Sequence, residues 1–256
     1  MTQSIRRWLK PLFGRTGLLW RCIPAPRLRY RVFRDRVDLL LYSLSISFPD
    51  IRFLQLGAND GTGFLEPFLR LGHWTGVLVE PVPYLFARLD RRYGSNSRLA
   101  LEHAAVATDR TKRPFHYFAI GTTGLDGADQ LGSFSYERVR AHCRGRPLLE
   151  ASIVTEEISA VTLPELFRKH ALAPLHLLQM DLEGYDYEVL RSLDLANDGA
   201  VLILYEHCLL KPADQEAARQ LLHRSGYDTL VIGQDTAALR RNAGGHLRQS
   251  WKLLHD

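Results

Sequence analysis

The stretch "RFLQLGANDGTGF", Arg52–Phe64, joins an apolar run to a turn that contains three glycines, Gly57, Gly61 and Gly63. The apolar half has the length of a buried β-strand, and glycines directly after a strand let another group approach the backbone closely. A helix that begins after such a turn offers free backbone N–H groups at its first residues. The stretch therefore predicts a strand, a tight turn and a helix, with the turn open to a ligand.

Short apolar runs alternate with helical patterns from residue 50 onward. The expected strands are 51–58, 76–81, 98–108, 175–184, 200–207 and 227–233, and the expected helices are 64–72, 82–94, 161–170, 185–193 and 211–226. The run 113–120 is expected to pair antiparallel with strand 98–108. This alternation is typical of parallel strands joined by right-handed crossovers. The predicted fold class is α/β: a doubly wound, mostly parallel sheet with helices on both faces.

Two regions depart from this rhythm. We expect a basic arm or helical extension over residues 1–49 and a single domain over residues 50–256, with an insert at about 121–152. An insert of this length without strong periodicity is often a lid or a binding loop. Its hydroxyl and arginine side chains are suited to bind a sugar, a phosphate or a carboxylate, although a solvated helix would explain the arginines equally well.

Composition excludes several classes of protein. The three cysteines, Cys22, Cys143 and Cys208, lie far apart, and the ten histidines show no metal-ligand spacing. This argues against a disulfide framework and against a metal site, and it suits a reducing compartment. No apolar run approaches the roughly 18 residues that a membrane-spanning helix needs. We expect a cytoplasmic protein, with peripheral membrane contact as an option.

The positive charge is concentrated at the N-terminus. Residues 1–36 hold ten Lys and Arg against one acid, whereas the rest of the chain holds 23 basic and 27 acidic residues. Ile5, Trp8, Leu9, Leu12 and Phe13 fall on one face of a helix, which fits contact with an anionic membrane. Packing of the arm on the domain and a transit peptide are the alternatives, and Pro11 weakens the helix. No base-reading motif accompanies the charge, so we expect no nucleic-acid partner.

Two features of the first strands point to one nucleoside. The glycine turn follows the first strand, and Glu80 ends the second strand, where a carboxylate can accept hydrogen bonds from both ribose hydroxyls. The dinucleotide fingerprint G-x-G-x-x-G is absent, because Asn59 stands where its second glycine belongs. The pattern present also occurs in short-chain dehydrogenases, but no tyrosine here has a lysine four residues on. A nicotinamide-dependent oxidoreductase is therefore only a third interpretation.

Several segments in succession resemble the FkbM-type family of S-adenosylmethionine-dependent methyltransferases. They are "FLQLGANDGTGF", "GVLVEPVPYLFARL", "LEHAAVA", "ISAVTLPEL", "LLQMDLEGYDYEVL" and "LILYEH", and they cover roughly residues 50–233. The most telling pieces are Glu80-Pro81 and the Asp181-x-Glu183-Gly184 turn before a helix. The resemblance implies a Rossmann-like class I methyltransferase that uses S-adenosyl-L-methionine as methyl donor.

The resemblance also implies which residues hold this donor. Those around its amino-acid moiety, its ribose and its adenine would be Gln55, Gly57, Ala58, Asn59, Gly61, Glu80, Pro81, His103, Ala104 and Ala105. The family usually carries an acid in place of Gln55, so this position implies a neutral contact or weaker donor binding. O-methylation of a sugar, glycolipid or secondary metabolite is the reaction it implies, with a small-molecule or carbohydrate acceptor.

The strand ends also supply candidates for proton removal from an acceptor hydroxyl. Methyl transfer mainly requires positioning, but a hydroxyl is a poor nucleophile unless a base takes its proton. Asp181 is the preferred base or orienting carboxylate, with Glu183 beside it and His207 as the competing base. Adjacent strand residues face opposite sides, so at most one of Glu206 and His207 faces the acceptor. A second interpretation of the chain is a non-catalytic adenosyl-ligand binder that docks to a membrane or partner through its basic arm.

Overall fold

The computed structural model describes residues 36–70, 74–123, 127 and 130–255, and these divide into two compact units. Of the described residues, the first unit contains 36–49 and 242–255, and the second contains residues 50–241. Residues 242–255 therefore group with residues 36–49 by their contacts. The reason is local packing: helix α12 (Gly245–His255) contacts helix α4 (Arg36–Ser47). Ser43 and Ser250 share a hydrogen bond of 2.7 Å between these helices.

The second unit is built on a seven-stranded sheet with the order β11-β12-β10-β9-β1-β2-β3. Its strands are β1 (Ile51–Leu56), β2 (Trp74–Val79), β3 (Leu99–Glu102), β9 (Leu177–Met180), β10 (Leu202–Glu206), β11 (Tyr227–Ile232) and β12 (Asp235–Arg240). The neighbouring strands from β10 to β3 are parallel, and β12 runs antiparallel to both β10 and β11. The prediction of a doubly wound, mostly parallel sheet is confirmed.

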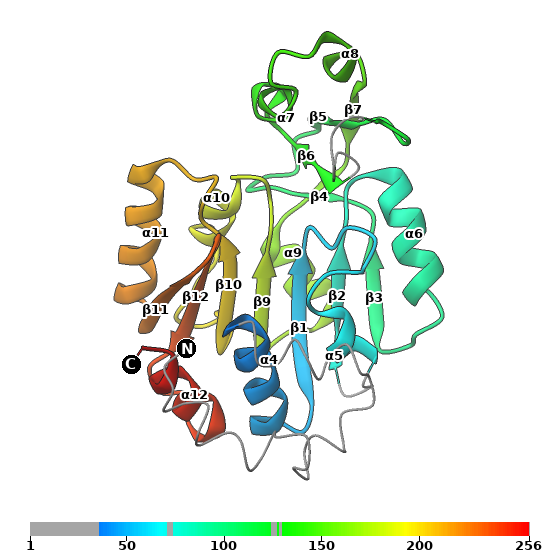
Figure 1. Cartoon of the computed structure of the whole chain (residues 1–256). Coiled ribbons are helices and arrows are strands. Elements are labelled where there is room, and N and C mark those ends of the chain that lie inside the picture. Colours follow the sequence, from blue (N-terminus) through cyan, green and yellow to red (C-terminus); the bar gives the residue numbers. More distant parts are fainter. Residues whose placement is uncertain (1–35, 71–73, 124–126, 128–129, 256) are drawn as a thin grey trace, which may run out of the picture. The chain divides into compact units, whose positions relative to one another are not determined.

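Helices connect and cover these strands (Figure 1). They are α5 (Glu66–Arg70), α6 (Pro83–Tyr93), α9 (Leu163–His170), α10 (Asp186–Leu190) and α11 (Pro212–Arg224). Helix α9 begins with a capping box, in which the Thr162 and Glu165 side chains accept from each other's backbone N–H groups. The end of the expected helix 64–72 lies partly outside the described residues, as does the amphipathic face within residues 1–13.

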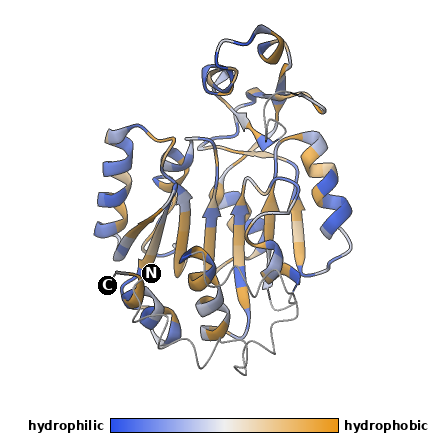
Figure 2. Ribbon diagram, viewed as in Figure 1, coloured by the Kyte–Doolittle hydropathy of each residue, from blue (hydrophilic) through white to orange (hydrophobic). Residues whose placement is uncertain are grey.

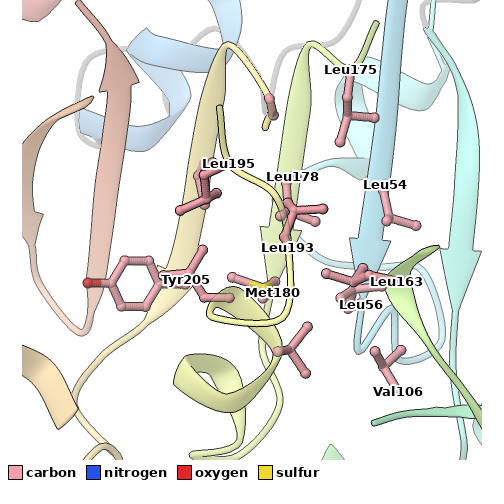
Figure 3. Close-up of a cluster of buried hydrophobic side chains, with 14 of the residues drawn as sticks. Leu54, Leu56, Val106, Leu163, Leu175, Leu178, Met180, Leu193, Leu195 and Tyr205 are labelled. Atoms are coloured by element: carbon pink, nitrogen blue, oxygen red, sulfur yellow. The ribbon is translucent and has the colours of Figure 1, made fainter. Parts of the chain in front are cut away.

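The core lies where apolar strands meet the inner faces of the helices. Leu54 and Leu56 of β1 pack with Leu178 and Met180 of β9, and this cluster continues to Tyr205 of β10 (Figure 3). Hydropathy follows the same division, with apolar strands and helices that carry hydrophilic faces (Figure 2). Side chains at such positions are fully buried, so the strands beside the turn of Gly57 form a rigid support.

Residues 113–158, a wider span than the insert expected at about 121–152, fold into a small sheet, which corrects the pairing expected for run 113–120, and we use the name insert for this wider span from here on. Strand β5 (Arg113–Phe118) pairs antiparallel with β6 (Gly132–Ser133) and β7 (Ile153–Ile158), and not with β3. Helices α7 (Tyr136–His142) and α8 (Pro147–Glu150) join β6 to β7. The expected strand 98–108 is divided, because its last part, β4 (Ala105–Val106), pairs with β8 (Ala160–Val161). Figure 1 shows the insert beyond the carboxyl ends of the parallel strands.

Candidate active site

The turn after β1 is held by its own backbone and by neighbouring strands. The N–H groups of Gly57 and Ala58 both donate to the Val79 carbonyl, at 3.0 and 2.9 Å. Gly57 has φ +76°, and a side chain there would meet the backbone carbonyl of Asp181. The glycine is therefore required by the close approach of strand β9.

Gly61 and Gly63 differ in the space around them. Gly61 has φ +79°, and a Cβ atom there would lie 2.5 Å from the Tyr93 ring and 2.9 Å from Leu89. Tyr93 also donates its hydroxyl hydrogen to the Gly61 carbonyl at 3.1 Å. A Cβ atom on Gly63, in contrast, would meet nothing within 4 Å. Two of the three glycines thus serve the packing of the turn on helix α6 and strand β9.

Glu80 is a buried carboxyl group that is hydrogen-bonded to this turn. It is 4% exposed, and its two oxygens accept from the backbone N–H groups of Asn59, at 2.8 Å, and Val82, at 2.9 Å. Asn59 adopts a left-handed conformation with φ +54°, which turns its N–H toward the carboxyl group. Burial raises the pKa of Glu80 to about 7, and these two hydrogen bonds oppose the rise. Each oxygen keeps a lone pair for a further donor.

A pocket opens beside Glu80, and its two ends differ in chemistry. One end is apolar and contains Ala104, Ala105, Val106 and Phe115, and the Phe134 ring lies between Phe115 and Tyr185. The other end is polar and contains Gly57, Asn59, Asp181 and Glu183. The empty space amounts to about 670 Å³, part of which is open solvent. Such a shape fits a ligand with a flat apolar ring at one end and polar groups at the other.

The aromatic wall of the pocket comes from side chains that the sequence analysis did not assign to the site. Phe134 contacts Phe115 edge-on at 5.3 Å between ring centroids, and it contacts Tyr185 at 5.5 Å. The Arg113 guanidinium lies over the Phe134 ring at 5.9 Å. Gln130 and Gly132 of the insert complete this wall. The insert therefore contributes to the pocket through its small sheet, whereas the sequence suggested only hydroxyl and arginine side chains.

Asp181 and Glu183 lie together in the turn after β9. The Asp181 N–H donates to the Leu56 carbonyl at 3.0 Å, which ties this turn to the end of β1. Glu183 is in a left-handed conformation with φ +52°. Asp181 is exposed to the pocket, yet the surrounding protein raises its pKa through desolvation. Desolvation, followed by the charges of Asp181 and Glu206, raises the pKa of Glu183 to about 8.

Two further acids extend this group behind the pocket. Asp186 is fully buried, its Oδ1 atom has no hydrogen-bond partner, and its pKa is raised to about 8, chiefly by burial. Glu206 at the end of β10 also carries an unpartnered buried oxygen, and burial and the charge of Asp181 raise its pKa to about 7. We call Glu80, Asp181, Glu183, Asp186 and Glu206 the acid cluster.

His207 lies apart from this cluster. Its Nδ1 atom is 3.2 Å from the Thr236 hydroxyl of β12, and burial lowers its pKa. It is not among the residues that line the pocket. Of the pair at the end of β10, Glu206 interacts with Asp181, whereas the sequence analysis named His207 as the candidate base.

The predicted donor residues divide into two groups. The pocket is lined by Gly57, Asn59, Glu80, Pro81, Ala104 and Ala105, and it is not lined by Gln55, Ala58, Gly61 or His103. Gln55 is buried within β1, beside Gln179 of β9, and Ala58 is buried below the turn. His103 is exposed, stacks on Phe86 at 4.6 Å and lies 3.2 Å from the Pro81 carbonyl.

Comparison with known proteins gives this pocket a family. The model of the methyltransferase FkbM domain matches residues 55–229, more than half of the chain. The chain belongs to the FkbM methyltransferase family. It is a methyltransferase by this membership, and its strand order from β3 to β11 is that of a Rossmann-like sheet. A search of curated proteins found no match.

A search of solved structures found methyltransferases at low sequence identity. The precorrin-6y C5,15-methyltransferase of Geobacter metallireducens GS-15 is 11% identical, with a TM-score of 0.41 over 80% of this chain and 87% of that chain. The ribosomal protein L11 methylase of Lactobacillus delbrueckii subsp. bulgaricus is 8% identical, with a TM-score of 0.38 over 79% and 76% of the two chains.

Two searches of the described part of the chain found nothing. No helix there is both long and apolar enough to span a bilayer. The same residues contain no group of three or more His, Cys, Asp or Glu side chains arranged to hold a metal ion.

Proposed function

We propose that this FkbM-family methyltransferase uses S-adenosyl-L-methionine and methylates a hydroxyl group of a small-molecule or carbohydrate acceptor. The observation that carries the proposal is the pocket itself: an apolar, partly aromatic end, a carboxylate between the ends, and an acidic end at the turn of Asp181. Adenine, ribose and a cationic sulfonium amino acid match the chemistry of these three parts.

The residues present fit this donor. Glu80 keeps one lone pair on each oxygen for the ribose hydroxyls, while its hydrogen bonds to Asn59 and Val82 fix its orientation. The protein itself does not neutralise all of the negative charge that the acid cluster can carry. The positive charge of a bound sulfonium amino acid would favour the ionised form of these carboxyl groups. Gln55 lies below the pocket wall, so we propose that donor affinity depends on the acid cluster and the turn rather than on position 55.

The donor, when bound, supplies an electrophilic methyl group on sulfur. The task of the chain is then to orient the acceptor hydroxyl and to take its proton. We assign the proton to an Asp181 carboxylate oxygen, because Asp181 lines the pocket and is open to it. Glu183 has a pKa of about 8, so at neutral pH it is mostly protonated and serves better as a hydrogen-bond donor to the acceptor. His207 remains a second base only if the acceptor reaches the side of β12.

Donor binding and methyl transfer test the proposal in two steps. Calorimetry with S-adenosylhomocysteine measures binding, and labelled-methyl transfer to cell extract then detects an acceptor. Asp181→Asn should bind the donor product but transfer slowly, while Asp198→Asn, at an exposed position, should behave as wild type. Binding without transfer to any acceptor would favour the non-catalytic binder, and affinity for a nicotinamide dinucleotide instead would refute the donor assignment.

The partner proposals concern the arm, which lies outside the described residues. We propose that residues 1–36 contact anionic membranes, as their charge and apolar face indicate. The body of the chain carries a small excess of acids, and we expect no nucleic-acid partner. The acceptor is then reached from the cytoplasmic side or from the membrane surface.

A further inference from the structure

One arginine of the insert lies against the acid turn. Ser135 begins helix α7 as its N-cap, and its hydroxyl accepts from the backbone N–H of Arg138 at 3.3 Å. The cap fixes Arg138 on the first turn of the helix. From there its guanidinium extends to Gly184, where a Cβ atom would lie 2.6 Å from Nη2 and 2.7 Å from Nη1. Only a glycine at position 184 leaves room for this contact.

The Arg138 guanidinium differs from its neighbour on the same helix. Arg140 forms ion pairs with Glu137, at 3.1 Å, and with Glu150, at 2.9 Å, and both pairs lie at the surface. The Arg138 guanidinium is half-buried, and within the described residues it forms no hydrogen bond or ion pair. Its charge is therefore not neutralised within helix α7 and acts on the turn that it contacts.

We propose that Arg138 is a positioning residue that docks the insert on the Gly184 backbone and increases the ionised fraction of Glu183 and Glu206. The assignment to catalysis rests on the proposed function, whereas the electrostatic contact does not.

The charges around these two acids give the direction of the effect. Glu183 faces Asp181, Asp186 and Glu206, which all raise its pKa, and Arg138 is the cation that lowers it. Glu206 faces Asp181, Asp235 and the Cys208 thiol, and Arg138 again lowers its pKa. Removing the guanidinium charge therefore raises both pKa values, and ionisation of the acids moves to higher pH.

The experiment compares wild type with Arg138→Lys, Arg138→Met and Arg144→Met. Arg144 is exposed in the loop after α7, so its replacement removes an equal charge from the insert. The first readout is unfolding by urea between pH 6 and 9 without any ligand. The second readout is the pH profile of methyl transfer, or of S-adenosylhomocysteine binding if no acceptor is in hand.

Both acids have folded-state pKa values above the unfolded value of 4.5, so their contribution to stability is lost as pH rises through the folded pKa. In Arg138→Met the folded-state pKa values are higher, so the loss of stability should continue to higher pH than in wild type. The difference in free energy of unfolding between wild type and Arg138→Met should therefore grow from pH 6 to pH 9. The transfer profile should move up by about 0.5 to 1 pH unit. Arg138→Lys should restore most of the wild-type pH dependence of stability and most of the wild-type transfer profile. Arg144→Met should change neither of these two readouts.

Three outcomes test this proposal, and the last two of them separate it from the proposed function. A deficit of Arg138→Met that is the same at every pH would mean a purely structural role and would overturn the proposal. If the deficit grows with pH but wild type binds neither S-adenosylmethionine nor S-adenosylhomocysteine, the electrostatic contact stands and the donor assignment fails. If wild type transfers methyl groups and the Arg138→Met profile is unshifted, the donor assignment stands and the role of Arg138 is wrong.

Discussion

Replacement of Glu80 by glutamine should remove the pH dependence of donor binding. In wild type the carboxyl group has a pKa of about 7, so it is ionised in roughly one molecule in ten at pH 6 and in about nine in ten at pH 8. The ribose hydroxyls donate to the ionised form, and binding therefore favours it. Affinity for S-adenosylhomocysteine should rise about tenfold between pH 6 and 8, which corresponds to about 1.4 kcal/mol.

Glu80→Gln keeps the size of the side chain but cannot ionise. Its affinity should be lower than that of wild type by about 1–3 kcal/mol at pH 8, the range for a lost partner of a buried hydrogen-bonding group. Its amide nitrogen also faces a backbone N–H group, either that of Asn59 or that of Val82, and this adds a cost that does not vary with pH. The ratio of the two affinities, measured by calorimetry at each pH, cancels the titration of the ligand itself.

The free protein provides an independent control for the same group. Because the folded-state pKa of Glu80 lies above its unfolded value of 4.5, its contribution to stability is present at low pH and is lost as pH rises through 7. Wild type should thus lose about 3 kcal/mol relative to Glu80→Gln between pH 4.5 and pH 8. If the affinity ratio is the same at pH 6 and 8 while the stability difference changes as stated, the ribose lies elsewhere and the assignment of Glu80 is wrong.

Three further predictions concern other parts of the chain. Gly57→Ala should destabilise the protein by about 1–3 kcal/mol, because φ is positive and the new methyl group meets the Asp181 carbonyl; a urea midpoint equal to that of wild type would contradict this. Tyr93→Phe should cost about 1 kcal/mol through the lost hydrogen bond to Gly61, with turnover preserved, as thermal unfolding and transfer assays can check. Deletion of residues 1–36 should reduce co-sedimentation with anionic vesicles, and undiminished sedimentation would assign membrane contact to another segment.

The sheet was largely predictable because its parallel strands are long apolar runs. Strand β12 was missed, since Ala237 and Ala238 give it little of the β-branched or aromatic character that marks a strand, and a two-residue turn at Gly233 joins it to β11. The small sheet of the insert was also missed. Its pairing partners, β5 and β7, are separated by a long segment, and only tertiary packing brings them together.

The site was predictable where it lies at strand ends and not where it lies on the insert. Gly57, Glu80 and Asp181 follow β1, β2 and β9, which are neighbours in the sheet, so their meeting follows from the topology alone. Alternation along β10 places Glu206 and His207 on opposite faces of the sheet, but it does not say which face lies toward the pocket. The choice between them therefore needed the pairing of β10 with β12. Phe115 and Phe134 line the pocket through the folding of the insert, which leaves no local pattern in the sequence.

The distribution of charge decides which nucleoside ligand the pocket favours. A nicotinamide dinucleotide carries a pyrophosphate, and it would place that anion near Glu80, Asp181 and Glu183, two of which have pKa values already raised to about 7 and 8. Added negative charge would raise them further and would cost free energy, since like charges disfavour ionisation. A sulfonium amino acid reverses the sign of this interaction and restores the ionised carboxylates. The acidic end of the pocket therefore argues for the methyl donor by the same electrostatics that would exclude a dinucleotide.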